Sequence, residues 1–246
     1  MRSGHAATAA APVVAAGVGV RYGSVWVLRL ASFTLIRSES GRATLGIAAP
    51  RAAPASATLV DLLAGRTAPG YGSLRVLGHD LGTPRGRALA RQQIGVASRT
   101  GRIFPAVRVR GLVECAARRS VRPGSDRHLL VAAVLDRLGL TPWAEVPLRA
   151  APDLVLRRAR VAAACVHQPK LLIAHGLLDE LGPRDRAVLT DLLRDIERDT
   201  AVVAIGRDPE PLAVLCDRVL TLDAGIVVDV PEPAPDAPAP VLARSA

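Results

Sequence analysis

The sequence contains almost no lysine and few aromatic residues. Lys170 is the only lysine among the 32 lysine and arginine residues. The Gly-Lys-Ser/Thr triplet of a phosphate-binding loop therefore cannot occur anywhere in the chain. Aromatic residues make up 2% of the chain, which leaves few rings to stack on single-stranded nucleic acid. The core must be built mainly from alanine, valine and leucine.

Cysteines and long apolar runs are scarce as well. Cys115, Cys165 and Cys216 lie about fifty residues apart without a C-x-x-C pair, and the histidines show no ligand spacing. We therefore expect neither a metal site nor a disulfide framework, and we expect a reduced cytoplasmic setting. No run approaches the length of a membrane span, and the apolar segment 6–20 lacks the leucines of a secretory signal.

The formal net charge is +10, a balance that can favour nucleic acid or an anionic membrane surface. The arginines are scattered, however, and the densest group is Arg157, Arg158 and Arg160. We interpret them as part of an arginine-rich solvated surface. Nucleic acid is therefore not an expected partner.

Short apolar runs alternate with helical patterns along the chain. Strand patterns occur at 13–20, 25–30, 32–35, 43–48, 73–77, 91–97, 171–174, 201–205, 219–222 and 226–230. Helical patterns occur at 58–63, 107–119, 129–138, 156–167, 184–198 and 209–216, and Gly65 and Gly139 follow two of them as C-caps. This alternation predicts a mostly parallel sheet with helices on both faces. Residues 1–12 and the proline-rich segment 231–246 are predicted to be disordered.

An ordered set of motifs resembles the ATP-binding-cassette (ABC) transporter ATPases. It comprises Arg21-Tyr22-Gly23, LLAG at 62–65, GSLRVLGHDL at 72–81, IGVA at 94–97, IFPAVRVRGLVE at 103–114, LDRLGL at 135–140, VHQPKLLI at 166–173, GPRDR at 182–186 and RDPEPLAVLCDRVLTLDAGIVV at 207–228. The resemblance implies one domain over 13–230 with the P-loop NTPase-like ABC ATPase fold. That fold has a mostly parallel sheet core, an antiparallel N-terminal β-subdomain and a helical subdomain at about 105–160.

The positions that carry chemistry in the family hold other residue types in this chain. The resemblance places the phosphate-loop glycines on Pro50, Ala53 and Ala55, the lysine on Ser56, and the Mg²⁺-binding serine on Ala57. It places the loop glutamine on Arg99, the signature sequence on 151–155 (APDLV), the metal-holding aspartate on His175, the catalytic glutamate on Gly176, the aspartate of the following loop on Gly182, and the γ-phosphate-sensing histidine on Arg207. Only Tyr22, where the family stacks adenine, and Thr58 keep their types, so these two are the candidate ATP contacts if ATP binds at all. No catalytic residue and no metal ligand is implied, and the motifs do not support ATP or Mg²⁺ as a cofactor.

Asp179 and Glu180 are alternative candidates for the catalytic carboxylates. They lie four residues out of register with the family's pair, and acidic residues ahead of a helix have a simpler role at its positive end. We interpret them as an exposed acidic pair ahead of the start of a helix.

These substitutions predict a non-catalytic ATP-binding-type subunit with a structural or regulatory role in a transport complex. The implied partners are a membrane-spanning transporter subunit and, as a second candidate, an intact ATPase subunit, with a dimer as a further candidate state. The implied location is the cytoplasm or the inner face of the cell membrane. Two alternatives stay open: a divergent ATPase that uses Thr58, Asp179 and Glu180, and an anion- or nucleic-acid-binding module that uses Arg99, Arg207 and the arginines at 157–160.

Overall fold

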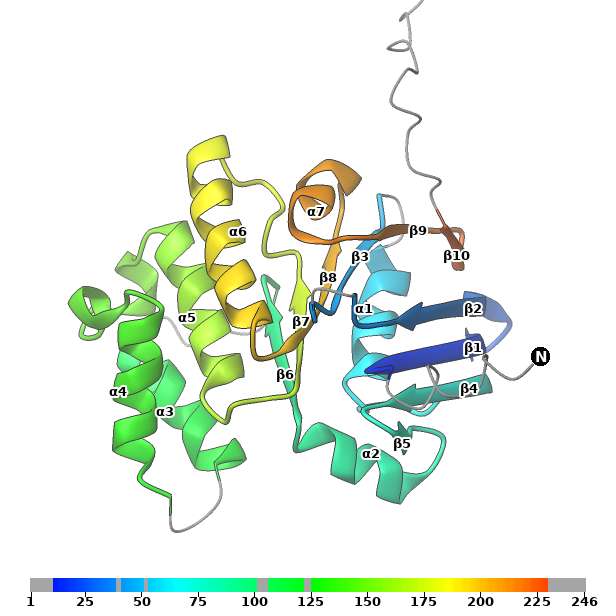
Figure 1. Cartoon of the computed structure of the whole chain (residues 1–246), viewed down its shortest axis with the longest axis horizontal. Helices are drawn as coiled ribbons and strands as arrows, with labels where there is room; N and C mark the ends of the chain where they lie inside the picture. Colours follow the sequence, from blue (N-terminus) through cyan, green and yellow to red (C-terminus); the bar gives the residue numbers. More distant parts are fainter. Residues whose placement is uncertain (1–10, 39–40, 51–52, 101–105, 122–124, 230–246) are drawn as a thin grey trace, which may run out of the picture.

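The chain folds into two sheets, with one helix between them, a short helix beside the smaller sheet, and the helices between residues 109 and 197 on the outer side of the larger sheet (Figure 1). A computed structural model describes residues 11–38, 41–50, 53–100, 106–121 and 125–229. The predicted disordered segments 1–12 and 231–246 lie outside the described residues, except for Ala11 and Pro12.

The smaller sheet is antiparallel and lies at the N-terminal end of the chain. Its strand order is β2-β1-β4-β5. The strands are β1 (Val13–Tyr22), β2 (Val25–Leu35), β4 (Tyr71–Val76) and β5 (His79–Asp80). The patterns expected at 25–30 and 32–35 belong to one strand, because the left-handed backbone at Leu30 (φ 47°) is absorbed as an irregularity within β2.

The larger sheet has the order β10-β9-β3-β8-β7-β6 and is parallel from β9 to β6. Its strands are β3 (Thr44–Ala48), β6 (Ile94–Ser98), β7 (Leu171–His175), β8 (Ala201–Gly206), β9 (Val219–Asp223) and β10 (Ile226–Asp229). β3, β7 and β8 are almost entirely buried apolar runs, as expected for strands covered on both faces.

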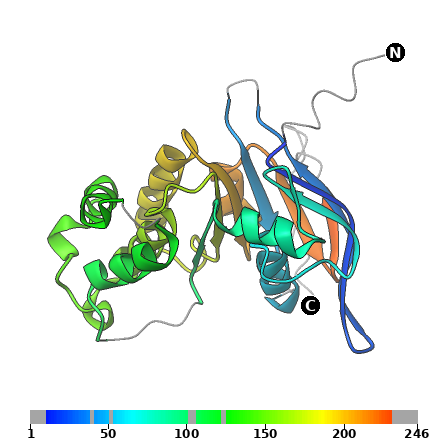
Figure 2. The same ribbon diagram turned by 90° about the horizontal axis from the view of Figure 1, so that it is seen from below.

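The helices divide between the two faces of the larger sheet. They are α1 (Ala53–Leu63), α2 (Pro84–Arg91), α3 (Val109–Ser120), α4 (Arg127–Arg137), α5 (Asp153–Cys165), α6 (Pro183–Glu197) and α7 (Pro209–Leu215), with two 3-10 turns at Thr141–Trp143 and Leu148–Ala150. α1 packs between the two sheets, whereas α3, α4, α5 and α6 cover the opposite face (Figures 1 and 2). None of the helices in the described residues is both long and apolar enough to cross a membrane.

The structure differs from the sequence prediction at the start of one helix and at the start of one strand. The helix expected to begin at Thr58 begins at Ala53, because alanine favours helix and Pro54 lies in the first turn, where its missing N–H is not needed. The strand expected at 91–97 begins at Ile94, and α2 precedes it. The Thr83 hydroxyl caps α2 by accepting a hydrogen bond from the Gly86 N–H (3.0 Å). The expected C-cap glycines Gly65 and Gly139 do have positive φ.

Candidate functional site

A pocket of about 190 Å³ opens at the carboxyl ends of β3, β6, β7 and β8. This strand-end pocket lies where ligands usually bind in open α/β sheets. The residues that line it are Ala49, Ser56, Ala57, Arg99, Thr100, His175, Gly176, Asp179, Ile205, Gly206 and Arg207. A neighbouring hollow of about 330 Å³ shares Ala57, Thr100 and His175 with it. A larger hollow of about 430 Å³ lies elsewhere, and its Arg137 is paired with Asp195 and Asp199.

The pocket brings together positions that are far apart in the sequence. The resemblance singled out Ser56, Ala57, Arg99, His175, Gly176 and Arg207, and all six line it. Pro50, Ala55, Gly182 and the segment 151–155 do not line it. The six positions predicted from the motifs therefore meet at one site, formed by the ends of three strands and the start of α1.

Thr58 and Tyr22, the two candidate nucleotide contacts, do not line this pocket. Thr58 is buried in α1, and its hydroxyl donates to the Pro54 carbonyl of the same helix (2.9 Å). Tyr22 ends β1 at the hairpin turn, and its side chain is 58% exposed. The structure therefore does not bring the two residues together, and both remain predictions as ATP contacts.

His175 ends β7 and lies between two serine hydroxyls. Its Nδ1 atom is 3.2 Å from the Ser98 Oγ atom on β6, and its Nε2 atom is 3.4 Å from the Ser56 Oγ atom on α1. Burial lowers the pKa of His175, and nearby Arg99 lowers it further, whereas Asp179 and Asp61 act in the opposite direction. A neutral imidazole can accept one hydrogen bond and donate another, so His175 links β6, β7 and α1.

We expect this burial to make stability depend on pH. Burial lowers the pKa of both His167 and His175 below the ordinary value of 6.5. As the pH falls through 6.5, the unfolded chain therefore takes up protons before the folded chain does, and the free energy of unfolding falls. Equilibrium denaturation on either side of pH 6.5 measures this slope. H175Q should flatten it, and H167Q/H175Q more so; an unchanged slope in the double variant would contradict this assignment.

Arg99 and Arg207 share one carboxylate across the mouth of the pocket. The Arg99 guanidinium donates to both Glu180 oxygens, from Nη1 at 2.8 Å and from Nη2 at 3.3 Å. The Arg207 Nη2 atom lies 3.3 Å from the same carboxylate. Beside it, the Asp179 Oδ1 atom accepts the backbone N–H of Arg207 at 2.9 Å. Each of the two guanidinium groups is therefore paired with an acidic residue of the chain itself.

The interpretation of Asp179 and Glu180 as an exposed pair ahead of a helix holds for Glu180 but is wrong for Asp179, which is half-buried. Asp179 lines the pocket, and Glu180 joins two arginines at its mouth. Glu180 has a left-handed backbone (φ 57°), which is uncommon for a residue with a side chain. The sequence could have placed them near the pocket, because they follow a buried strand closely. The chain leaves such a strand at the ligand-binding edge of the sheet.

Arg157 holds the segment that carries these carboxylates. It is 2% exposed, and its Nη1 atom donates to the carbonyls of Leu177 (2.7 Å), Asp179 (2.6 Å) and Gly176 (3.4 Å). Its Nε and Nη2 atoms donate to the Asp153 carboxylate at 2.9 and 2.6 Å. α5 therefore fixes the chain between β7 and α6.

The neighbouring arginines of α5 are likewise engaged inside the protein. Arg158 donates to the Leu138 carbonyl and Arg160 to the Ser98 carbonyl. Burial lowers the pKa of both guanidinium groups. The interpretation of these arginines as a solvated surface is wrong for this cluster, which has a structural role. In the part of the chain that the structure describes, no group of three or more His, Cys, Asp or Glu residues is placed to hold a metal ion.

This architecture is the ABC ATPase fold, and comparison with solved structures confirms it. The chain superimposes on cbiO1 from Clostridium perfringens, described as part of the ABC transporter complex cbiONQ, with a TM-score of 0.76 and 18% identity, covering 89% of this chain and 87% of that one. A second structure, described as the ATP binding subunit of an ABC transporter, gives a TM-score of 0.71 and 16% identity, covering 87% of each chain. No protein-family model matches the chain.

The sequence is similar to ATP-binding subunits of both import and export systems. It is 28% identical over 183 residues to the methionine import ATP-binding protein MetN 2 of Burkholderia mallei, covering 73% of this chain and 46% of the relative. It is 24% identical over 210 residues to the linearmycin resistance ATP-binding protein LnrL of Bacillus subtilis, covering 85% and 65%. It is 27% identical over 211 residues to the Nod factor export ATP-binding protein I of Rhizobium leguminosarum, covering 85% and 66%. The matches thus span about half to two thirds of these curated relatives.

Proposed function

We propose that this chain is an ATP-binding-type subunit of an ABC transporter that does not hydrolyse ATP and acts as a structural or regulatory partner. The fold and the similarity to transporter subunits support the first part of the proposal. The second part is supported by the strand-end pocket, because ATP hydrolysis depends on charges that neutralise phosphates and orient a water molecule.

The observation that carries the proposal is the shared carboxylate of Glu180. An ATP site needs cations that are free to meet the γ-phosphate. Among the described residues that line the pocket, the arginines are Arg99 and Arg207, and both are paired with Glu180. A phosphate group would have to displace a carboxylate that is covalently part of the chain and therefore always present at high effective concentration.

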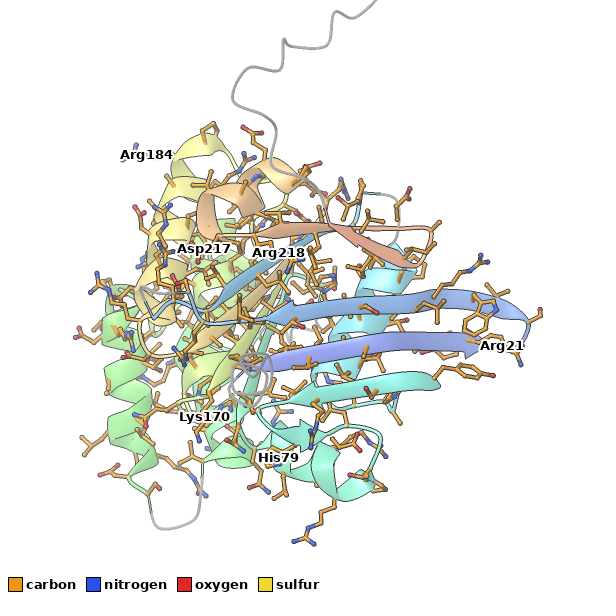
Figure 3. All side chains as sticks on the ribbon, turned by 45° about the vertical axis from the view of Figure 1, so that its right-hand side comes forward. Arg21, His79, Lys170, Arg184, Asp217 and Arg218 are labelled. Carbon is orange, nitrogen blue, oxygen red and sulfur yellow. The ribbon has the colours of Figure 1, made fainter. Side chains whose placement is uncertain are left out.

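The positions of the lysine and the metal ligand support the same conclusion. Ser56 and His175 stand there, and they face one another at hydrogen-bond distance instead of presenting positive charge or a carboxylate. Lys170 cannot replace the missing phosphate-loop lysine. It precedes Leu171 at the amino end of β7, whereas the pocket lies at the carboxyl end (Figure 3). The residues present therefore do not fit Mg-ATP.

The partners follow from the relatives. An ATP-binding-type subunit acts with a membrane-spanning subunit, so we propose such a subunit as the partner, with an intact ATPase subunit or a second copy of this chain as further candidates. The proposed location is the cytoplasm, at the inner face of the cell membrane when the complex is assembled. Co-purification of a membrane-spanning protein or an intact ATPase with this chain would support this assignment.

A divergent ATPase is the alternative, and Asp179 is the residue that favours it, because its carboxylate lines the pocket. That reading also needs Thr58 and Glu180, whose side chains are bonded to Pro54 and to the two arginines. The structure therefore supports it less well than the non-catalytic role.

We expect the purified chain to show neither Mg-ATP-dependent thermal stabilisation nor ATP turnover above background. The physical reason is the internal pairing of Arg99 and Arg207. Thermal unfolding with and without Mg-ATP and a phosphate-release assay measure the two properties. ATP turnover that E180Q abolishes would establish the divergent ATPase and overturn the proposal. R118M, which changes an exposed arginine of α3, is the matched control and should leave any such turnover unchanged.

A further inference from the structure

The β1–β2 hairpin and the adjoining start of β4 carry half of the aromatic residues of the chain. Of two tryptophans, two tyrosines and two phenylalanines, Trp26, Tyr22 and Tyr71 lie on β2, β1 and β4. These residues are 37%, 58% and 55% exposed. With Arg21, Val25 and Leu30 they form what we call the hairpin patch.

Arg21, Trp26 and Tyr71 lie together across three strands, whereas Tyr22 and Val25 pair with each other on the other side of the hairpin. The Trp26 ring covers Gly19 of β1, where a Cβ atom would lie 3.1 Å from the ring. The centroids of the Trp26 and Tyr71 rings are 5.4 Å apart, and the Arg21 guanidinium carbon lies 5.9 Å from the Trp26 ring centroid. Gly19 thus leaves room for an ordered aromatic and cationic platform on the solvent side of the sheet.

Leu30 extends the apolar part of this platform, and Val25 adds an exposed apolar side chain on the other side of the hairpin. Leu30 is 75% exposed, and its side chain lies next to Gly17, which is on the same side of β1 as Gly19. Val25 is 63% exposed and follows the hairpin turn. Exposed apolar side chains that gather in one place indicate an interaction surface, whereas scattered ones need no explanation.

Charge on these strands is of one sign. Strands β1, β2 and β4 contain no aspartate or glutamate, while Arg21, Arg29 and Arg75 on them are exposed. The hairpin reaches beyond the end of β4, and Arg21 lies near its tip (Figure 3). The three strands therefore form a projecting, basic, aromatic edge, and the acidic residues beside them are Asp80, opposite Arg75 on β5, and Asp223, at the turn whose Gly225 carbonyl accepts the Arg29 N–H.

We propose that the hairpin patch docks on the surface of an anionic phospholipid bilayer. Tryptophan and tyrosine have an apolar ring with a polar group and are enriched at membrane–water interfaces. Arginines beside them can meet lipid phosphates, and the electrostatic part of such binding is lost at high salt. A hairpin that projects from the body can reach a flat surface without displacing other elements. This binding is independent of the strand-end pocket and of any transporter partner.

The test uses the full chain carrying W143F, which leaves Trp26 as its only tryptophan. We expect Trp26 emission to shift to shorter wavelength with vesicles of phosphatidylglycerol and phosphatidylcholine, and brominated acyl chains to quench it. Vesicles of phosphatidylcholine alone should have a much smaller effect. In cosedimentation, R21Q should weaken binding about fivefold, and W26A/Y71A should weaken it at least about tenfold.

L129A is the control, because Leu129 is also a highly exposed leucine (67%) but lies on α4, and it should bind as the unmodified chain does. Equal binding to neutral and anionic vesicles, or an unchanged Trp26 spectrum, would overturn the proposal. Tighter binding of the patch to polyuridylate than to anionic vesicles would also overturn it and assign the surface to nucleic acid. If W26A/Y71A fails to fold, the R21Q measurement and the Trp26 spectrum still decide.

Discussion

Replacing Arg157 by methionine should lower the free energy of unfolding by about 3 kcal/mol. The substitution keeps the apolar stem but removes every donor to the Leu177 and Asp179 carbonyls and to the Asp153 carboxylate. Losing the donor of a buried acceptor costs about 1–3 kcal/mol for each group. We discount the ion pair itself because the Asp153 side chain is 57% exposed. Equilibrium denaturation measures the effect, and hydrogen exchange over residues 176–180 should quicken.

Two further variants make this experiment specific. R157K keeps the charge but not the forked geometry, so it should recover only part of the lost stability. R118M removes an arginine from the exposed end of α3 and should change the free energy of unfolding by less than about 0.5 kcal/mol. A loss for R157M no larger than that for R118M would show that Arg157 does not hold this segment.

Replacing Gly95 by alanine should also destabilise the chain by about 3 kcal/mol. Gly95 lies in β6 directly against α5, and a Cβ atom there would overlap the carbonyl oxygen of Ala164 and approach the Pro169 ring. The helix backbone cannot yield easily, so the strand or the helix must shift, and overpacking of this kind costs about 1–3 kcal/mol or more. The shift would also move Ser98 and Arg99 at the pocket end of the strand.

Denaturation of G95A beside G182A measures this packing. The methyl group of G182A would enter open space, because no atom lies within 4 Å of its Cβ position. Gly182 is the N-cap residue of α6, so we expect its replacement to cost less than about 1 kcal/mol. Equal stability of G95A and G182A would mean that β6 and α5 are not packed as the structure has them.

Much of the fold could be predicted because the local signals agree with one another. Buried strands such as β7 and β8 are continuous apolar runs, and the glycines at 65 and 139 end helices with positive φ. α2 was not predicted, because a short, arginine-rich segment has a weak apolar pattern. Its start is instead marked by Thr83 and Pro84, a cap pattern that could have been recognised.

The pocket could be predicted only in part. The register of the motifs placed Arg99, His175 and Arg207 at one site, and the structure brings them together. It did not indicate that Glu180 would join the two arginines, because this depends on the left-handed backbone at Glu180 and on Arg157 holding the segment from α5. Such a contact between distant segments leaves no periodic pattern in the sequence.

In the proposed role, the arginines of the strand-end pocket are paired with the chain's own carboxylates, and the pocket does not bind nucleotide. Thermal unfolding in the presence of Mg-ATP tests it most directly. A chain that binds a ligand present at about 100 times its Kd gains about 2.7 kcal/mol, and for a domain of this size that raises Tm by roughly 5–10 °C. We predict no change in Tm at millimolar Mg-ATP. A saturable rise of several degrees that E180Q alters and R118M does not would contradict the account.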